Sequence, residues 1–251
     1  MMDRKAIVVA ISGCSSSGKT TISRLLRDIF PNTFILHEDD FYKTDTDIPL
    51  NKGIADWDCA EAIDIPAMTE AVAYIRQHAQ IPPTLNSMED QNSVGKCPVP
   101  DSVIEDLKAK ALAAIPANHP LRESRLRMCL FDGFLLYSKS MTKLAPSLDV
   151  KVLLRASYAQ AKARREARDG YVTLEGFWKD PPGYVDDIVW PNYVKEHEWM
   201  FENGDVEGKY KQDVLEKEGI LVPNGGALDP DMSEVLKWMV DTILNELSKY
   251  K

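Results

Sequence analysis

Between Gly13 and Thr20 the chain reads Gly-Cys-Ser-Ser-Ser-Gly-Lys-Thr, the pattern G-x-x-x-x-G-K-[ST] of a phosphate-binding loop. Glycines allow the tight backbone that turns N–H groups towards phosphate oxygens. A lysine then reaches the β and γ phosphates, and a final hydroxyl can bind Mg²⁺. We therefore expect Mg²⁺ at Thr20 and the phosphates of ATP at Gly13, Ser15, Ser16, Ser17, Gly18, Lys19, Thr20 and Thr21.

The sequence around this loop has the strand–loop–helix order that the motif requires. The apolar, β-branched run 6–11 comes directly before the loop, and the helix-forming stretch 21–30 follows it. The amino end of such a helix adds the positive end of its dipole to the phosphate site. We therefore interpret the glycines as part of a nucleotide site rather than as a chance turn.

Acidic residues follow the next predicted strand, 33–37. The segment His37-Glu-Asp-Asp-Phe-Tyr42 lies at the carboxyl end of that strand, the edge where open α/β sheets bind ligands. A carboxylate beside the γ-phosphate can orient an acceptor hydroxyl and take its proton as the new P–O bond forms. Asp39 is therefore a candidate general base. The alternative is an aspartate that caps a helix or a turn.

Another carboxylate, Asp132, ends the apolar run 126–131. In Walker B elements a carboxylate in this place holds Mg²⁺ directly or through water. Apolar runs that end in aspartate are common, so the prediction of Asp132 as a metal ligand depends on the other motifs in the same chain. A phosphate loop precedes it and an arginine cluster follows it, which is the order of a phosphotransferase.

That basic cluster consists of Lys162, Arg164, Arg165 and Arg168 on a predicted helix. Arginines at the start of a flexible lid can clamp the transferring phosphoryl group. We expect Arg165 and Arg168 to do so, with the lid at about 168–183. The alternative is a solvated helix face.

The elements that must position these residues alternate between extended apolar runs and helical stretches. The runs cover 6–11, 33–37, 126–131 and 150–154, and the helical stretches cover 18–30, 60–80, 157–168, 186–203 and 231–249. This alternation predicts an α/β P-loop fold, a parallel sheet with flanking helices, in a single domain 1–251. The Pro- and Asn-rich stretch 81–125, with a helix candidate at 101–114, is predicted to be a surface insertion.

The composition favours a small-molecule partner. A formal net charge of -9 argues against a nucleic-acid surface, and no run approaches the ~20 apolar residues of a membrane span. Four cysteines lie far apart without a C-x-x-C pair, which favours the cytosol or nucleus. The first apolar run leads into the phosphate loop rather than a cleavage site, so we expect no secretion signal. The oligomeric state stays open.

Four segments together resemble the nicotinamide riboside kinases, relatives of uridine kinase and phosphoribulokinase. They are Ile11–Thr21, Asp39–Tyr42, Asp132–Leu136 and Pro182-Gly-Tyr-Val-Asp-Asp-Ile-Val-Trp-Pro191. The first segment occurs in many unrelated proteins and the third in many kinases, whereas the last is specific to this family. The resemblance spans most of the chain, roughly residues 6–80 and 126–205.

The resemblance implies roles for individual side chains. It implies that Asp39 is the general base, that Asp58 holds the ribose hydroxyls, and that Tyr42 and Trp57 are aromatic walls around the pyridinium ring. Such walls suit a permanently charged ring, because aromatic faces attract cations by about 0.5–2 kcal/mol. The alternative for Trp57 is a half-buried core side chain.

Three features depart from the family pattern. The stretch 81–125 is longer than in compact members of the family. The family can carry glutamate where Asp132 stands, which changes the reach towards Mg²⁺ by one methylene. One extra residue lies between Arg168 and Tyr171, so we assign Tyr171 no contact with the ring.

The sequence thus predicts a kinase that transfers the γ-phosphate of ATP to the 5′-hydroxyl of nicotinamide riboside, giving the mononucleotide used in NAD synthesis. A pyrimidine nucleoside kinase would need hydrogen-bonding groups for a uracil or cytosine edge, where this chain offers aromatic walls. A nucleotide-binding regulatory protein without transfer activity is the alternative if Asp39 is structural. A GTPase is disfavoured, because Asn51-Lys52-Gly53-Ile54 lacks the aspartate of a guanine-reading segment.

Overall fold

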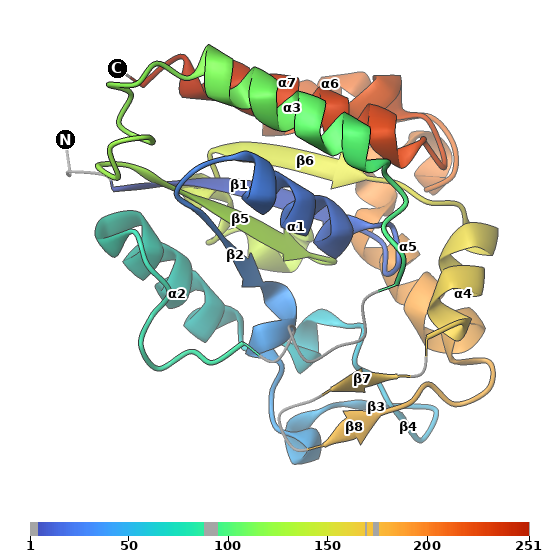
Figure 1. Cartoon of the computed structure of the whole chain (residues 1–251). Helices are drawn as coiled ribbons and strands as arrows, with labels where there is room; N and C mark the ends of the chain where they lie inside the picture. The colour runs from blue at the N-terminus through green and yellow to red at the C-terminus, as the bar shows by residue number, and fades with distance from the viewer. Residues whose placement is uncertain (1–4, 88–94, 169, 173–175, 251) are drawn as a thin grey trace.

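A parallel sheet forms the centre of the computed structural model, which describes residues 5–87, 95–168, 170–172 and 176–250 (Figure 1). The strands, in spatial order, are β2 (Thr33–His37), β5 (Arg127–Gly133), β1 (Ala6–Gly13), β6 (Val150–Leu154) and β9 (Ile220–Leu221), and every neighbouring pair is parallel. The predicted parallel sheet and its four extended runs are confirmed. The two-residue β9 is too short to show a periodicity in the sequence.

The central strand, β1, is buried along its whole length. Ala6, Val8 and Ala10 belong to one hydrophobic cluster, and the residues between them belong to a second cluster on the opposite face. A strand that is buried on both faces needs a continuous apolar run rather than an alternating one. This explains the composition of 6–11 and fixes the phosphate loop at the end of the most buried strand.

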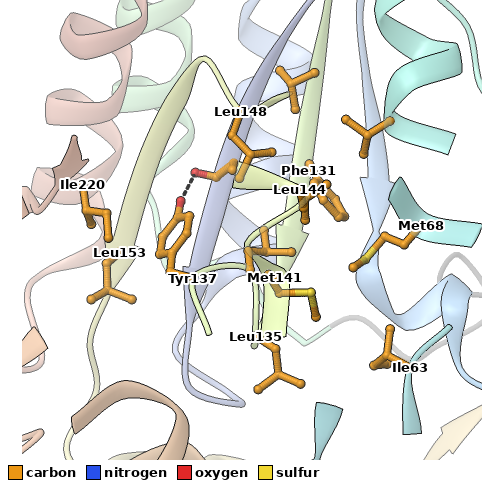
Figure 2. Packing of buried hydrophobic residues seen from close by; sticks show 14 of the residues in the cluster. Ile63, Met68, Phe131, Leu135, Tyr137, Met141, Leu144, Leu148, Leu153 and Ile220 are labelled. Carbon is orange, nitrogen blue, oxygen red and sulfur yellow. Dashed lines mark hydrogen bonds between the residues drawn. The ribbon is translucent and has the colours of Figure 1, made fainter. Parts of the chain in front are cut away.

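Helices cover both faces of the sheet (Figure 1). One face carries α1 (Lys19–Ile29), α3 (Asp101–Ala114) and α7 (Met232–Leu247), and the other carries α2 (Ile65–His78), α5 (Trp190–His197) and α6 (Gln212–Glu218). Figure 2 shows part of the cluster that contains Ala6, Val8 and Ala10, where the Tyr137 hydroxyl donates to the carbonyl oxygen of Ala10 at 2.8 Å. None of the helices in the described part of the chain is long and apolar enough to cross a membrane.

The prediction of one continuous helix over 186–203 is wrong. A π-helical turn (Val185–Val189) leads into α5, and short 3-10 turns follow at 198–200 and 202–204. Pro191 lies in the first turn of α5 and has no N–H to donate, and the neighbouring Trp190 N–H bonds five residues back to Val185. The predicted helix 60–80 begins late, at Ile65, because Asp64 caps it by accepting from the Ala67 N–H at 2.9 Å.

The stretch 81–125 contributes to the core, which the prediction of a surface insertion did not anticipate. Leu107, Ala111 and Ile115 are buried in the cluster beneath α1 and α7. The His119 ring is buried as well and bonds the carbonyl oxygen of Leu247 at 3.1 Å. Residues 88–94 of this stretch lie outside the described residues. The division into one domain with an insertion stays a prediction.

Two short hairpins lie beyond the carboxyl ends of the central strands (Figure 1). They are β3 (Leu50–Asn51) with β4 (Ile54–Ala55), and β7 (Tyr171–Val172) with β8 (Phe177–Trp178). The second hairpin follows α4 (Tyr158–Glu166) and falls in the predicted lid 168–183, of which residues 169 and 173–175 lie outside the described residues. That this region closes as a lid stays a prediction.

Replacing Leu107 in α3 with Ala should lower the free energy of unfolding by about 2–5 kcal/mol, because its buried side chain would leave a cavity in the core. Leu112 lies on the same helix but is 54% exposed, so Leu112→Ala should change the value by no more than ~0.5 kcal/mol. Denaturant unfolding of both variants measures the difference. Equal, small effects would show that α3 is not part of the core.

Candidate active site

The phosphate loop turns sharply between β1 and α1. Gly13 has a φ of +151°, and a Cβ there would lie 2.3 Å from the carbonyl oxygen of Leu154. Gly18 has a φ of +96°, and a Cβ there would lie 2.3 Å from Cε of Met232. Both positions therefore exclude a side chain, and the loop is packed between β6 and the start of α7.

One cavity brings together nearly all of the predicted site residues. It is lined by Ser15, Ser16, Gly18, Lys19, Thr20, Thr21, Asp39, Tyr42, Trp57, Asp58, Asp132, Arg165 and Arg168. Gly13 and Ser17 are not part of this lining. The cavity lies at the carboxyl ends of β1, β2 and β5, where the parallel strands bring the phosphate loop and the acidic residues to one edge.

The charges of Lys19 and Asp39 influence the pKa values of both groups in this cavity. Burial lowers the pKa of Lys19, while the charges of Asp132 and Asp39 oppose that shift. The surrounding protein and the charge of Asp132 raise the pKa of Asp39, although the side chain itself is exposed to the cavity. The Lys19 ammonium also donates to the carbonyl oxygen of Cys14 at 2.9 Å, inside the phosphate loop.

The two carboxylate oxygens of Asp132 differ: one is hydrogen-bonded to His37, and the other has no hydrogen-bond partner among the described residues. His37 and Asp132 are register partners on β2 and β5, and His37 Nδ1 lies 2.6 Å from Asp132 Oδ1. Asp132 Oδ2 is buried and has no hydrogen-bond partner among the described residues. No group of three or more His, Cys, Asp or Glu side chains in the described ranges could hold a metal ion by itself. The unpartnered Oδ2 fits Mg²⁺, which binds few protein carboxylates and completes its shell with phosphates and water.

Glu38 is a site residue that the sequence reasoning missed. Its Oε2 accepts from the N–H groups of Phe134 and Leu135, at 2.5 and 3.0 Å. Burial raises its pKa to about 8. A Cβ on Gly133 would lie 2.5 Å from Oε2, so the glycine after Asp132 makes room for this carboxyl. That glycine is the signal in the sequence that could have revealed the contact.

Asp58 and Arg165, which were predicted to serve different ligands, form one buried ion pair. Arg165 donates to both oxygens of Asp58, at 2.7 and 2.9 Å. It also donates to both oxygens of Asp180, at 2.7 and 3.2 Å, and to the Ser15 hydroxyl at 2.9 Å. Burial raises the pKa of Asp58, and the charge of Arg165 opposes that effect. Asp180 was not predicted, because no motif marks it.

Aromatic rings line one side of the cavity. The rings of Tyr42 and Trp57 meet edge to face with their centroids 5.3 Å apart. Phe134 stacks on Tyr42 at 6.4 Å, and Trp178 lies 5.8 Å from Trp57. Trp57 is only 6% exposed, so it is a core side chain and a cavity wall at once. Phe134 and Trp178 add two walls that were not predicted.

Tyr171 also lines the cavity, although the extra residue before it left its role unassigned. The guanidinium groups of Arg165 and Arg168 lie 5.1 and 5.2 Å from the centre of its ring. Arg168 also donates to the Tyr171 hydroxyl at 3.1 Å. The two predicted lid arginines therefore converge on one aromatic ring.

A second cavity also borders the phosphate loop. It shares Ser16, Gly18, Thr20, Thr21, Arg168 and Tyr171 with the first cavity, and it adds Ser17. Its other walls include residues of α4 and the segment 229–232, which precedes and begins α7. The sequence reasoning missed this cavity because segment 229–232 carries no recognisable motif. The phosphate loop thus borders two cavities.

A phosphate loop after the central strand, with carboxylates at the carboxyl ends of the parallel strands β2 and β5, defines a P-loop phosphotransferase. No protein-family model matches the chain. A nicotinamide riboside kinase of Schizosaccharomyces pombe is 40% identical over 98% of this chain and 100% of its own length. The nicotinamide riboside kinase of Saccharomyces cerevisiae is 38% identical over 83% of this chain and 84% of its own. The chain belongs to the nicotinamide riboside kinase family.

A solved structure described as a possible uridine kinase from Bacillus stearothermophilus covers 77% of this chain and 82% of its own at 16% identity. Its TM-score of 0.43 is too low to carry an argument.

Replacing Glu38 with Gln should stabilise the protein relative to wild type increasingly as the pH rises. The pKa of Glu38 is about 8 in the folded protein and about 4.5 for an ordinary glutamate, so the folded state binds this proton more tightly. Wild type therefore loses stability between these pH values, whereas glutamine has no proton to lose there. Denaturant unfolding of both proteins at about pH 5 and about pH 8 measures the difference. A constant difference would contradict a protonated Glu38.

Proposed function

We propose that this protein transfers the γ-phosphate of ATP to the 5′-hydroxyl of nicotinamide riboside, producing the mononucleotide used for NAD synthesis. The observation that carries the proposal is one cavity in which the phosphate loop, Asp39 and the wall formed by Tyr42 and Trp57 face each other. The relatives named above support the same substrate. Such a transfer requires positioning and charge stabilisation more than covalent chemistry by the protein.

The phosphate loop and the basic side chains hold the nucleotide in this proposal. Lys19 stabilises negative charge on the β and γ phosphates, and Arg168 adds a second positive charge at the same cavity. Arg165 contacts the loop through the Ser15 hydroxyl. The second cavity, beyond Ser17, offers space for the nucleoside half of ATP. The residues that would hold Mg²⁺ are Thr20 and Asp132, and the ion would neutralise phosphate charge there.

Asp39 acts on the acceptor in this proposal. Its carboxylate is exposed to the cavity between the loop and the aromatic wall, where it can accept the proton of the 5′-hydroxyl. The positive charge of Lys19 favours the ionised form that a base needs, against the effects of burial and of Asp132. The positions of Asp39 and Lys19 thus serve both the phosphoryl donor and the acceptor.

The aromatic wall and the ion pair recognise the riboside. The ring faces of Trp57 and Tyr42 attract the pyridinium charge, and Trp178 extends the same wall. Asp58 lies next to Trp57, so its carboxylate, held by Arg165, is placed to accept from the ribose hydroxyls. We propose the cytosol or nucleus as the location, since all four cysteines are unpaired.

An assay with Mg²⁺ and ATP, offering nicotinamide riboside, uridine and cytidine side by side, tests the proposal. Mass analysis should show a mononucleotide formed mainly from nicotinamide riboside. The Asp39→Asn variant should lose turnover by orders of magnitude while it still binds ATP, and Asp45→Asn, an exposed carboxylate of the same cavity, should keep it. Phosphorylation of a pyrimidine nucleoside alone would refute the proposed substrate. ATP binding without any transfer would favour a regulatory protein.

Replacing Trp57 with Leu should raise the KM for nicotinamide riboside by about 2- to 30-fold, the equivalent of a cation–π contact of 0.5–2 kcal/mol. The KM for ATP should not change. The dihydro form of the riboside has an uncharged ring, so its KM should rise less. Steady-state kinetics with both ribosides measures the contrast. An equal rise for both would mean that Trp57 acts through packing alone.

A further inference from the structure

The segment Pro182–Pro191, the most family-specific stretch of the sequence, has no part in the site as described so far. None of its residues is among the described residues that line the cavity. Its side chains nevertheless reach the segment 55–58 from behind, and that segment carries Trp57 and Asp58. The question is what these contacts do for the site.

The segment begins with a tight turn that directs Tyr184 inwards. The Tyr184 N–H bonds the carbonyl oxygen of Pro181 at 3.1 Å, and Gly183 has a φ of +80°. Proline followed by a residue with positive φ is the sequence of a type II turn. The turn leaves Tyr184 only 1% exposed, in a cluster with Val185, Ile188 and Val189 of the π-helical turn.

The Tyr184 hydroxyl holds the backbone on both sides of Asp56. It accepts from the Trp57 N–H at 3.0 Å and donates to the carbonyl oxygen of Ala55 at 3.1 Å. Without this hydroxyl, a buried N–H and its neighbouring carbonyl would each lose a partner. Groups of this kind are costly to leave unpaired, so the hydroxyl restricts the position of the Trp57 backbone.

Asn192, one residue beyond the segment, holds Asp56, which lies between Ala55 and Trp57. Its amide nitrogen donates to both carboxylate oxygens of Asp56, at 2.8 and 3.0 Å. Asp56 in turn accepts from the Asp58 N–H at 3.1 Å. The backbone N–H groups of Trp57 and Asp58 are therefore both fixed from the same helical region.

The ring of Tyr184 supports the other half of the site. The Arg165 guanidinium lies 5.5 Å from its centre, and the Trp178 ring meets it edge to face at 5.7 Å. One buried side chain thus contacts the backbone of one aromatic wall, the ring of another, and the arginine that holds Asp58.

We propose that Tyr184 is a positioning residue, assisted by Asn192, that fixes Trp57 and Asp58 in the orientation that binds the riboside. The proposal rests on the function proposed above. It assigns the family-specific segment to recognition of the acceptor, not to the nucleotide. Tyr184 acts through the backbone of 55–58 and through Arg165, without touching the substrate.

The test compares Tyr184→Phe with Tyr137→Phe in the full-length protein. Both changes remove a buried hydroxyl. The Tyr137 hydroxyl, seen in Figure 2, bonds the carbonyl oxygens of Ala10 and Val152 in the central sheet and not the segment 55–58. Tyr184→Phe should raise the KM for nicotinamide riboside about tenfold and leave the KM for ATP unchanged. Tyr137→Phe should change neither KM. Asn192→Ala should raise the riboside KM in the same direction, and it serves as a second variant if Tyr184→Phe does not fold.

The proposal would be overturned if Tyr184→Phe and Asn192→Ala both fold and leave the riboside KM unchanged. It would also be overturned if they raise the KM for ATP as much as the KM for the riboside. A second readout needs no substrate: the Trp57 amide should exchange its hydrogen faster in Tyr184→Phe than in wild type or Tyr137→Phe. If wild type fails to phosphorylate nicotinamide riboside, the proposed function fails. The exchange rate of the Trp57 amide then decides the positioning role, and unchanged protection refutes it.

Discussion

A single buried guanidinium joins the parts of the site that are far apart in the sequence. Arg165, on α4, bonds Asp58, Asp180 and the phosphate loop at the same time. Removing charges from water is costly, and a buried pair recovers that cost only with close, saturated hydrogen bonding. The bidentate contact of Arg165 with Asp58 provides such bonding. Because two carboxylates share one arginine, a loss of Arg165 would leave the buried charge of Asp58 and the half-buried charge of Asp180 without their cation.

The sheet edge supplies the rigid half of the site, and the loop segments supply the other half. Asp132 lies at the carboxyl end of β5, Asp39 lies in the 3-10 turn after β2, and Lys19 begins α1 after the loop that follows β1, so the pairing of these strands sets their approximate spacing. Trp57 and Trp178 come from segments outside the central sheet. The Tyr184 hydroxyl holds the Trp57 backbone, whereas Trp178 is held by its pairing with Tyr171 in the β7–β8 hairpin and by the bond of its indole N–H to Asp180. Chemistry on the phosphates thus depends on the sheet, whereas recognition of the acceptor depends on a network of buried polar contacts.

The sequence predicted the local features of the site and missed the contacts between distant segments. The phosphate loop and the strand-end aspartates were recognisable because strand, turn and helix each leave a local pattern. The pairing of Asp58 with Arg165 has no local pattern, and the sign of the Glu38 contact, Gly133, lies far from Glu38 in the chain. The same reason explains α3: its apolar residues were read as a modest surface helix, because the partners that bury them, α1 and α7, lie far away in the chain. The break in the helix 186–203 was detectable from Pro191.

The position of β1 has a consequence for the order in which the molecule is built. β1 is synthesised well before its two neighbours in the sheet, β5 and β6, which lie more than a hundred residues further along the chain. Until those strands have left the ribosome, an apolar, β-branched segment remains without its partners, and such long-range parallel pairing is intrinsically slow. The loop that marks this protein as a nucleotide enzyme therefore emerges before both strands that complete its native surroundings.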